Sequence, residues 1–143
     1  ITPHETSHQW FFSQVGNDQA IEPWLDEALA TYSEVIYYEQ YHPDLVQWWW
    51  DNRVYGQGPG GYINTSIYLD QGYEAYRNAV YLNGAIFLQE LRETVGDEAF
   101  FAAIKEYIKT KSYEIATTED FFNAMANQSF ADLSELRARF FQP

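Results

Sequence analysis

The sequence contains no cysteine, and this absence removes several kinds of chemistry. Disulfide bonds and thiolate catalysis are excluded, and any zinc site has to use histidine and carboxylate ligands. The cellular compartment stays open, because a chain without cysteine suits either redox setting.

Basic residues are scarce as well: eight Lys and Arg stand against 21 Asp and Glu, and the formal net charge is -13. Nucleic acid as a partner is disfavoured, because phosphate binding needs clustered Lys and Arg. An anionic membrane surface is disfavoured for the same reason. The acidity indicates a soluble surface, and a second interpretation is a field that attracts metal ions or the amino end of a peptide.

Long hydrophobic runs are missing too, so the sequence predicts no membrane-spanning segment. Hydrophobic residues nevertheless make up 46% of the 143 residues and aromatic residues 19%, which excludes a disordered chain. This length is typical of one domain with its own core. We therefore expect residues 1–143 to form a single helical unit.

Apolar residues recur at helical spacing along most of the sequence, and strand patterns are nearly absent. Thr2 and Pro3 look like an N-cap and first helical residue, Gly96 ends a helix, and Thr117 and Asp132 begin two others. The Gly-rich stretch 56–61 predicts a loop without the residues of a phosphate loop, and residues 62–72 stay ambiguous. The predicted helices span residues 3–15, 22–41, 43–54, 73–95, 97–111, 121–127 and 132–141. The fold class is therefore all-α, a bundle of six or seven helices.

A metal-binding motif lies at the start of the chain, where His4, Glu5 and His8 form the pattern HExxH. Histidines four residues apart on a helix point the same way, so both imidazoles can reach one cation. Glu5 is turned by about 100° from His4, which keeps it out of the ligand set but near the reacting water. We expect Glu5 to take the proton of that water and pass it to the leaving amine.

The third ligand has to come from another element, and Glu27 is the natural candidate. Eighteen residues separate His8 from Glu27, and turn-forming residues between them allow the second helix to fold back on the first. Ligand histidines also need partners for their other ring nitrogens. Glu34 is a candidate because it lies seven residues after Glu27 on the same helix face, while Asp26 and Asp18 compete for that role.

The stretch from His4 to Glu34 resembles the M1 family of zinc aminopeptidases, which are gluzincins. The similarity covers HExxH followed by Gln-Trp, the eighteen-residue gap, and the run Trp-Leu-Asp-Glu-Ala around Glu27. A second similar segment is Tyr-Leu-Asn-Gly-Ala, which begins at Tyr81. The resemblance implies that zinc is held by His4, His8 and Glu27, that Glu5 is the base, and that Tyr81 donates a hydrogen bond to the oxyanion.

The same resemblance implies what this chain lacks. The family binds the amino end of its peptide substrates through acidic residues on an upstream strand, and nothing in this sequence corresponds to that strand. The motif also lies only four residues from Ile1. We therefore expect the helical half of a gluzincin catalytic domain, whose partners include the missing N-terminal domains of the same protein.

Two other functions remain open at this point. A thermolysin-like endopeptidase shares HExxH and a distant Glu, although the segments around Glu27 and Tyr81 favour the aminopeptidases. A gluzincin-like binding scaffold without catalysis is the second, and the intact Glu5 argues against it. Of the remaining features, at least one of Trp48, Trp49 and Trp50 should point away from the core, since neighbours on a helix are about 100° apart. His42, the third histidine, is expected to end a helix rather than to bind metal.

Overall fold

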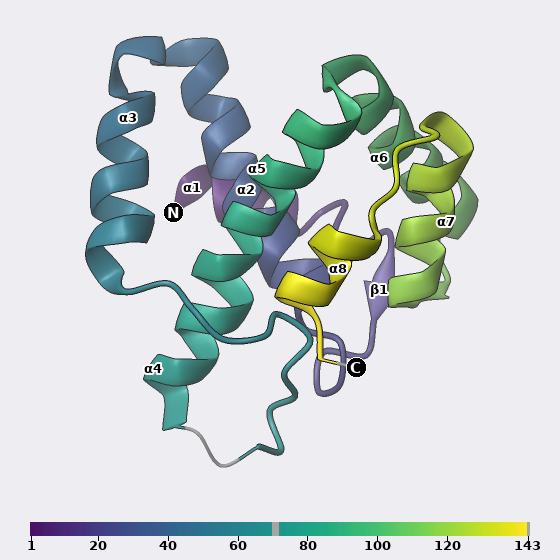
Figure 1. The fold of residues 1–143 in the computed structure, drawn as a ribbon, viewed down its shortest axis with the longest axis horizontal. Helices are drawn as coiled ribbons and strands as arrows, with labels where there is room; N and C mark the ends of the chain where they lie inside the picture. The colour runs from purple at the N-terminus through teal and green to yellow at the C-terminus, as the bar shows by residue number, and fades with distance from the viewer. Residues whose placement is uncertain (70–71, 143) are drawn as a thin grey trace.

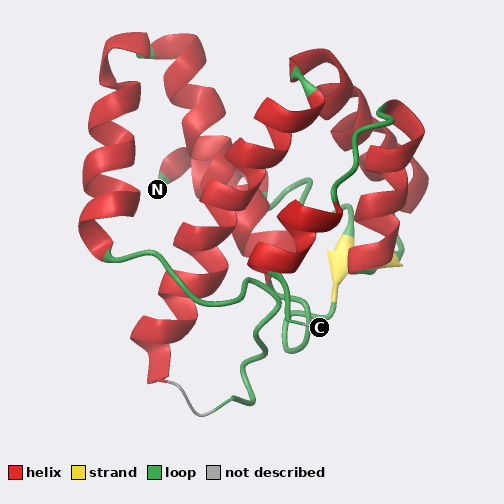
Figure 2. Cartoon of the chain, viewed as in Figure 1, coloured by secondary structure: helices red, strands yellow, loops and turns green. Residues whose placement is uncertain are grey.

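The computed structural model describes residues 1–69 and 72–142. Helices dominate this part of the chain, and the only strands in it are two of two residues each (Figures 1 and 2). The elements are α1 (Thr2–Ser7), β1 (Gly16–Asn17), α2 (Trp24–Tyr41), η1 (Pro43–Leu45), α3 (Val46–Trp49), η2 (Trp50–Val54), η3 (Tyr55–Gln57), α4 (Gly72–Arg77), η4 (Asn78–Asn83), α5 (Gly84–Val95), α6 (Asp97–Lys111), β2 (Ile115–Ala116), α7 (Thr118–Gln128) and α8 (Ser134–Phe140).

Several of these elements run into one another without a break. The segments η1, α3, η2 and η3 form one helical rod, and α4, η4 and α5 form another. Counted this way, residues 1–69 and 72–142 contain seven helical rods, which confirms the predicted all-α bundle. The π-helical segments η2 and η4 interrupt both rods, and π segments are often found at functional sites.

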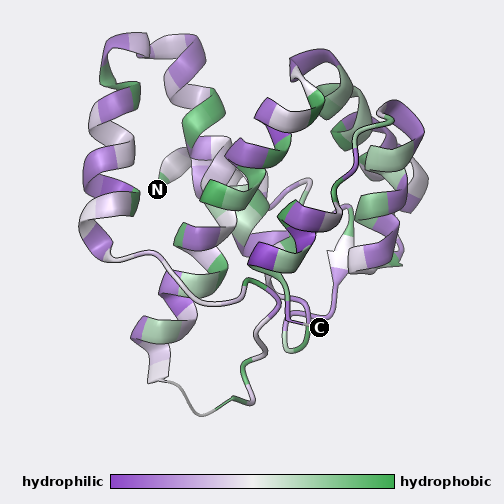
Figure 3. Cartoon of the chain, in the orientation of Figure 1, coloured by the Kyte–Doolittle hydropathy of each residue, from purple (hydrophilic) through white to green (hydrophobic). Residues whose placement is uncertain are grey.

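The helix α2 is the centre of the molecule, with α1, α5, η4 and α3 packed against it. Hydrophobic residues line the inward sides of the helices in Figure 3, and the core includes the fully buried Trp24, Leu25 and Ala28 of α2. The rod that carries Tyr81 approaches α2 very closely at Gly84, where an added Cβ would stand 2.5 Å from the Cβ of Ala28. This close approach fixes the rod against the helix that carries Glu27.

The prediction for the first helix is wrong in its length. The helix α1 ends at Ser7 instead of continuing to residue 15, and it begins at Thr2 with Ile1 as the N-cap residue. Residues 8–15 instead form tight turns, with Phe12 at a φ of 127°. They lead into β1, which pairs in parallel with β2 in the register Gly16 to Ile115. A pairing with a segment so far along the chain overrides the local helical preference.

The other helix predictions agree better with the structure. Thr117 forms the predicted capping box with Asp120 at the start of α7. Asp132 does not cap α8 directly, since Leu133 is the N-cap, but its carboxylate accepts a hydrogen bond from the backbone N–H of Ser134. Of the ambiguous range 62–72, residues 70 and 71 lie outside the described residues.

The tryptophan run divides as the helical geometry requires. Trp48 is 54% exposed, whereas Trp49 and Trp50 are buried, which confirms that one of the three points away from the core. No helix in the described ranges is both long and apolar enough to cross a bilayer.

Candidate metal centre

Two helices bring the HExxH residues and Glu27 together. His4 lies in α1, His8 is the C-cap residue that directly follows this helix, and Glu27 lies in the first turn of α2. The two imidazole rings are 4.9 Å apart and nearly perpendicular. His4 is buried, and His8 and Glu27 are half-buried, so the cluster faces solvent on one side only.

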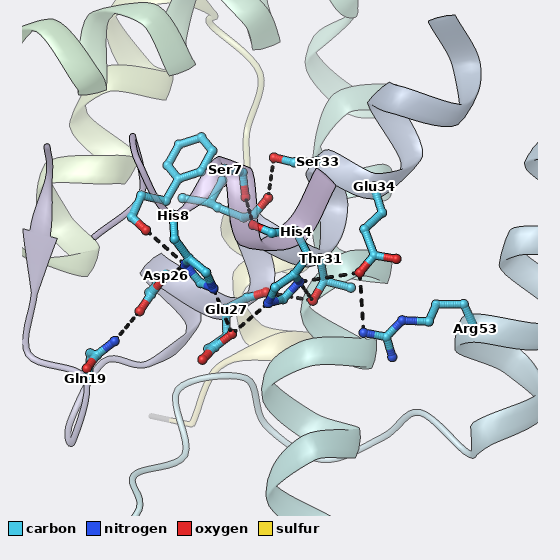
Figure 4. Close-up of polar contacts among 12 residues, drawn as sticks. His4, Ser7, His8, Gln19, Asp26, Glu27, Thr31, Ser33, Glu34 and Arg53 are labelled. Atoms are coloured by element: carbon cyan, nitrogen blue, oxygen red, sulfur yellow. Dashed lines mark hydrogen bonds and ion pairs between the residues drawn. The ribbon is translucent and has the colours of Figure 1, made fainter. Parts of the chain in front are cut away.

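The ring nitrogens divide between two sets of partners (Figure 4). The Nε2 atom of His4 lies 3.2 Å from Oε2 of Glu27, and the Nε2 atom of His8 lies 3.8 Å from the same oxygen. The Nδ1 atom of each ring faces another carboxylate instead: Glu34 Oε1 at 3.4 Å from His4, and Asp26 Oδ1 at 2.6 Å from His8. Both Nε2 atoms therefore point toward Glu27, while both Nδ1 atoms face a second carboxylate on the opposite side of the ring.

This donor set fits a zinc ion. One ligand atom from each of His4, His8 and Glu27 can be chosen so that all three lie within 4.8 Å of one another. Zinc bonds to imidazole nitrogen and carboxylate oxygen are about 2.0–2.2 Å long, so small side-chain movements suffice to bring the three atoms onto one ion. Two nitrogens and one oxygen are also a common ligand set of catalytic zinc, which keeps a further position for water.

The sequence left open which of Glu34, Asp26 and Asp18 contacts the second ring nitrogen of each histidine. Glu34 faces His4, and the fully buried Asp26 faces His8, so each acid is placed to orient one imidazole. Asp18 forms no ion pair with either ring in the described ranges, and its carboxylate instead accepts a hydrogen bond from the backbone N–H of Ala20. The two imidazoles differ in their second partner: His8 Nδ1 also lies 3.2 Å from the carbonyl oxygen of Phe11, whereas His4 Nδ1 lies 3.5 Å from the hydroxyl of Thr31.

Side-chain donors that no sequence motif indicated hold these two acids in turn. The indole N–H of Trp49 donates to Glu34 Oε2 at 2.9 Å, and Arg53 lies 3.5 Å from Glu34 Oε1. The side-chain amide of Gln19 donates to Asp26. The sequence shows only that Trp49 and Arg53 are four residues apart on one helical segment, and this spacing does not predict that both contact Glu34.

The buried charges shift the pKa values strongly. Burial opposes charge on His4, but hydrogen bonds with Glu27 and Glu34 raise the pKa of His4 to about 9. Burial alone would raise the pKa of Glu34, yet hydrogen bonds from His4 and Trp49 and the charge of Arg53 lower it to about 2. Burial raises the pKa of Asp26, and hydrogen bonds from Gln19 and His8 only partly oppose that effect.

Tyr81 lies in η4, beside the cluster of His4, His8 and Glu27. Its ring is parallel to the ring of His4, with centroids 6.1 Å apart. Burial and a hydrogen bond with the Glu27 carboxylate raise the pKa of Tyr81 well above its ordinary value, so the phenol keeps its proton. That same hydrogen bond helps to lower the pKa of Glu27, against the effect of burial. Tyr81 is therefore a neutral donor beside the cluster.

His42 lies at the end of a helix, as predicted, whereas the role of Glu5 stays a prediction. Glu5 is exposed on α1, and within the described ranges its carboxylate takes part in no hydrogen bond or ion pair. His42 is the C-cap residue of α2, lies near Tyr37, and is not part of the cluster.

Fold and cluster together have the features of a metallopeptidase catalytic domain, and the family comparison agrees. Residues 1–140 match the model of the peptidase family M1 domain, and the chain belongs to that family.

Individual relatives agree with this assignment. The chain is 28% identical over 132 residues to endoplasmic reticulum aminopeptidase 1 of Homo sapiens, a match that covers 87% of this chain and 14% of the relative. It is 27% identical over 149 residues to a leucyl aminopeptidase of Saccharolobus solfataricus, covering 96% of this chain and 19% of that protein. The chain therefore spans less than a fifth of the length of these relatives.

Solved structures match over almost the whole chain. One is a variant of the M1 zinc metallopeptidase of Deinococcus radiodurans bound to a Tyr-Ser-Ala substrate, with 26% identity and a TM-score of 0.74. That match covers 98% of this chain and 32% of the other. The fold is also similar to aminopeptidase A of Legionella pneumophila, with a TM-score of 0.75 over 97% of this chain and 16% of the other.

Proposed function

We propose that this chain is the zinc-binding helical part of an aminopeptidase that removes N-terminal residues from peptides. The observation that carries the proposal is the convergence of His4, His8 and Glu27, whose ligand atoms lie within 4.8 Å of one another. Membership of the M1 family supports it, because the matched relatives named above are aminopeptidases or zinc metallopeptidases. His4, His8 and Glu27 would hold the ion, with Glu34 and Asp26 orienting the two imidazoles.

The residues around the ion have distinct roles in this proposal. A bound zinc ion would supply a Lewis acid for the scissile carbonyl and the attacking water. Glu5 accepts a proton from that water and delivers it to the amine that leaves, a role that its unpaired carboxylate suits. Tyr81 donates its retained phenolic proton as a hydrogen bond to the oxyanion. The acidic residues that grip the substrate amine would come from elsewhere in the protein.

The ligand assignment is tested by measuring the zinc content of the purified chain. We expect His8→Ala to lower it to less than about a tenth of the wild-type value, since an open tetrahedral site with two protein ligands holds zinc weakly. The matched control is His42→Ala, which removes an exposed histidine at the end of α2. Equal zinc in the wild type and His8→Ala would rule out this ligand set.

A further inference from the structure

The carboxylate of Glu34 is held by two residues from a different rod. Its two oxygens have separate partners: Oε2 accepts the indole N–H of Trp49 at 2.9 Å, whereas Oε1 lies 3.4 Å from His4 Nδ1 and 3.5 Å from Arg53. Glu34 itself is 4% exposed. Its orientation toward His4 is therefore tied to the donor that occupies its other oxygen.

Trp49 is well suited to be a fixed donor. Its ring is 2% exposed and packs edge-to-face on Trp50, with centroids 5.0 Å apart. A tryptophan side chain has few rotatable bonds, and the packing of this ring on Trp50 restricts the direction in which its N–H can point. Arg53 follows four residues later on the same rod and reaches the same carboxylate from the solvent side, with 34% of its side chain exposed.

Removing the N–H would leave a buried carboxylate oxygen without a donor. A buried acceptor without a partner costs about 1–3 kcal/mol, and more when it is charged, so the group rotates or draws in water instead. Rotation of the Glu34 carboxylate would take Oε1 away from His4, because the carboxylate is rigid and its two oxygens turn together. The side chain of Trp49 therefore controls an imidazole that it does not touch.

We propose that Trp49 is a positioning residue of the metal site, which acts on His4 through Glu34 with Arg53 as an outer support. This inference rests on the proposed zinc ligands. It extends them to a chain of contacts from the α3–η2 rod to the HExxH helix: Trp49 to Glu34, and Glu34 to His4. The α3–η2 rod would thereby take part in metal binding although it supplies no ligand.

The test compares the zinc dissociation constants of single and double variants of the chain. Trp49→Phe keeps a large aromatic ring and removes the N–H. We expect zinc affinity to fall by about 3- to 10-fold, less than the 10- to 100-fold typical of a direct partner of a ligand histidine. Trp48→Phe is the matched control, since it makes the same change one residue earlier on the same rod, at an exposed indole that donates no hydrogen bond within the described ranges. We expect its zinc affinity to be unchanged.

A double-variant cycle separates positioning from a loss of packing. If Trp49 acts through Glu34, the effect of Trp49→Phe should vanish in the Glu34→Gln background, whereas a packing effect would persist there. The absorption spectrum of bound cobalt(II), which responds to the arrangement of the ligands, should change in Trp49→Phe and not in Trp48→Phe.

The outcomes distinguish this inference from the proposed function. A wild-type chain that binds no zinc overturns both. Wild-type binding that depends on His8, with Trp49→Phe equal to wild type or with additive effects of the two substitutions, overturns only the role of Trp49.

Discussion

At the scale of the residue, His4 is the most strongly coupled group of the site. It is buried between two carboxylates, Glu27 and Glu34, which raise its pKa to about 9 from an ordinary value of 6.5. The metal-free site therefore holds a proton on His4 at neutral pH. On the proposed ligand assignment, zinc binding would have to displace this proton, so metal and proton would compete for one imidazole.

This competition predicts how the stability of the metal-free chain depends on pH. Because the pKa of His4 is higher in the folded state than in the unfolded state, its stabilisation is complete below pH 6.5 and is lost as the pH rises through about 9. With a chelator present, we expect the free energy of unfolding to fall by up to about 3 kcal/mol between these limits. Urea unfolding at several pH values measures it.

Two controls accompany this measurement. His4→Gln should flatten the dependence over the same range, because the titrating group is gone. Saturating zinc should reverse its sign, because deprotonation of the ligands favours the bound ion. A slope that is the same in wild type and in His4→Gln would show that another group is responsible.

The site also shows what a sequence alone can supply at this scale. The pairing of His4 with His8 follows from their spacing on one helix turn, and Glu27 followed from the turn residues between the helices. Which acid lies behind which imidazole did not follow, because Glu34 and Asp26 are both near Glu27 in sequence. The rotation of α2 against α1 decides it, and that rotation is set by packing throughout the core.

At the scale of the element, the helices with local signals were predictable. The helix α7 has its capping box within four residues, and α6 begins directly after Gly96, which has a φ of 85°. The end of α1 at Ser7 has no comparable signal. It depends on the pairing of β1 with β2, and on the backbone N–H of Tyr113, which donates to the carbonyl oxygen of Gln14. Such pairings cannot be seen in a local pattern.

The contact of Gly84 with Ala28 gives a prediction at this scale. Gly84→Ala would place a Cβ 2.5 Å from the Cβ of Ala28, so α5 has to move away from α2. We expect a loss of about 1–3 kcal/mol in the free energy of unfolding, as is typical of overpacked cores. Urea unfolding measures the change.

The chain offers both a control and a double variant for this substitution. Gly60→Ala adds a methyl group where nothing lies within 4 Å, and it should change stability by less than about 0.5 kcal/mol. Ala28→Gly removes the methyl group that collides but is itself destabilising inside a helix, so the double variant should lose less stability than the sum of the two single losses. Fully additive losses would mean that the helices are not in contact at this point.

At the scale of the whole molecule, the chain carries a candidate set of metal ligands but spans little of the length of its relatives. It covers 14% of the human aminopeptidase and 32% of the Deinococcus radiodurans structure. On the proposed function, Glu5 and Tyr81 are present, while the groups that grip the substrate amine are not in this chain. Binding of the metal and turnover of peptides are thus separable properties.

We therefore expect the isolated chain to bind zinc but to hydrolyse peptides poorly. The absent substrate-gripping groups supply the positioning that makes a reaction effectively unimolecular, which is worth several kcal/mol of the barrier. Zinc content and the release of an N-terminal residue from a short peptide, measured on one preparation, test both parts. The zinc-free preparation is the control, and rapid turnover by the zinc-loaded chain would contradict the prediction.

The short ladder between β1 and β2 has a consequence for the order in which the protein is made. Gly16 and Asn17 pair with Ile115 and Ala116, and Glu22 accepts a hydrogen bond from the backbone N–H of Thr118, 96 residues further on. A ribosome therefore delivers both histidines and Glu27 long before the segment that ties down the turn between them. On the proposed ligand assignment, zinc capture is expected late in synthesis, once residues 115–118 have emerged and paired with residues 16–22.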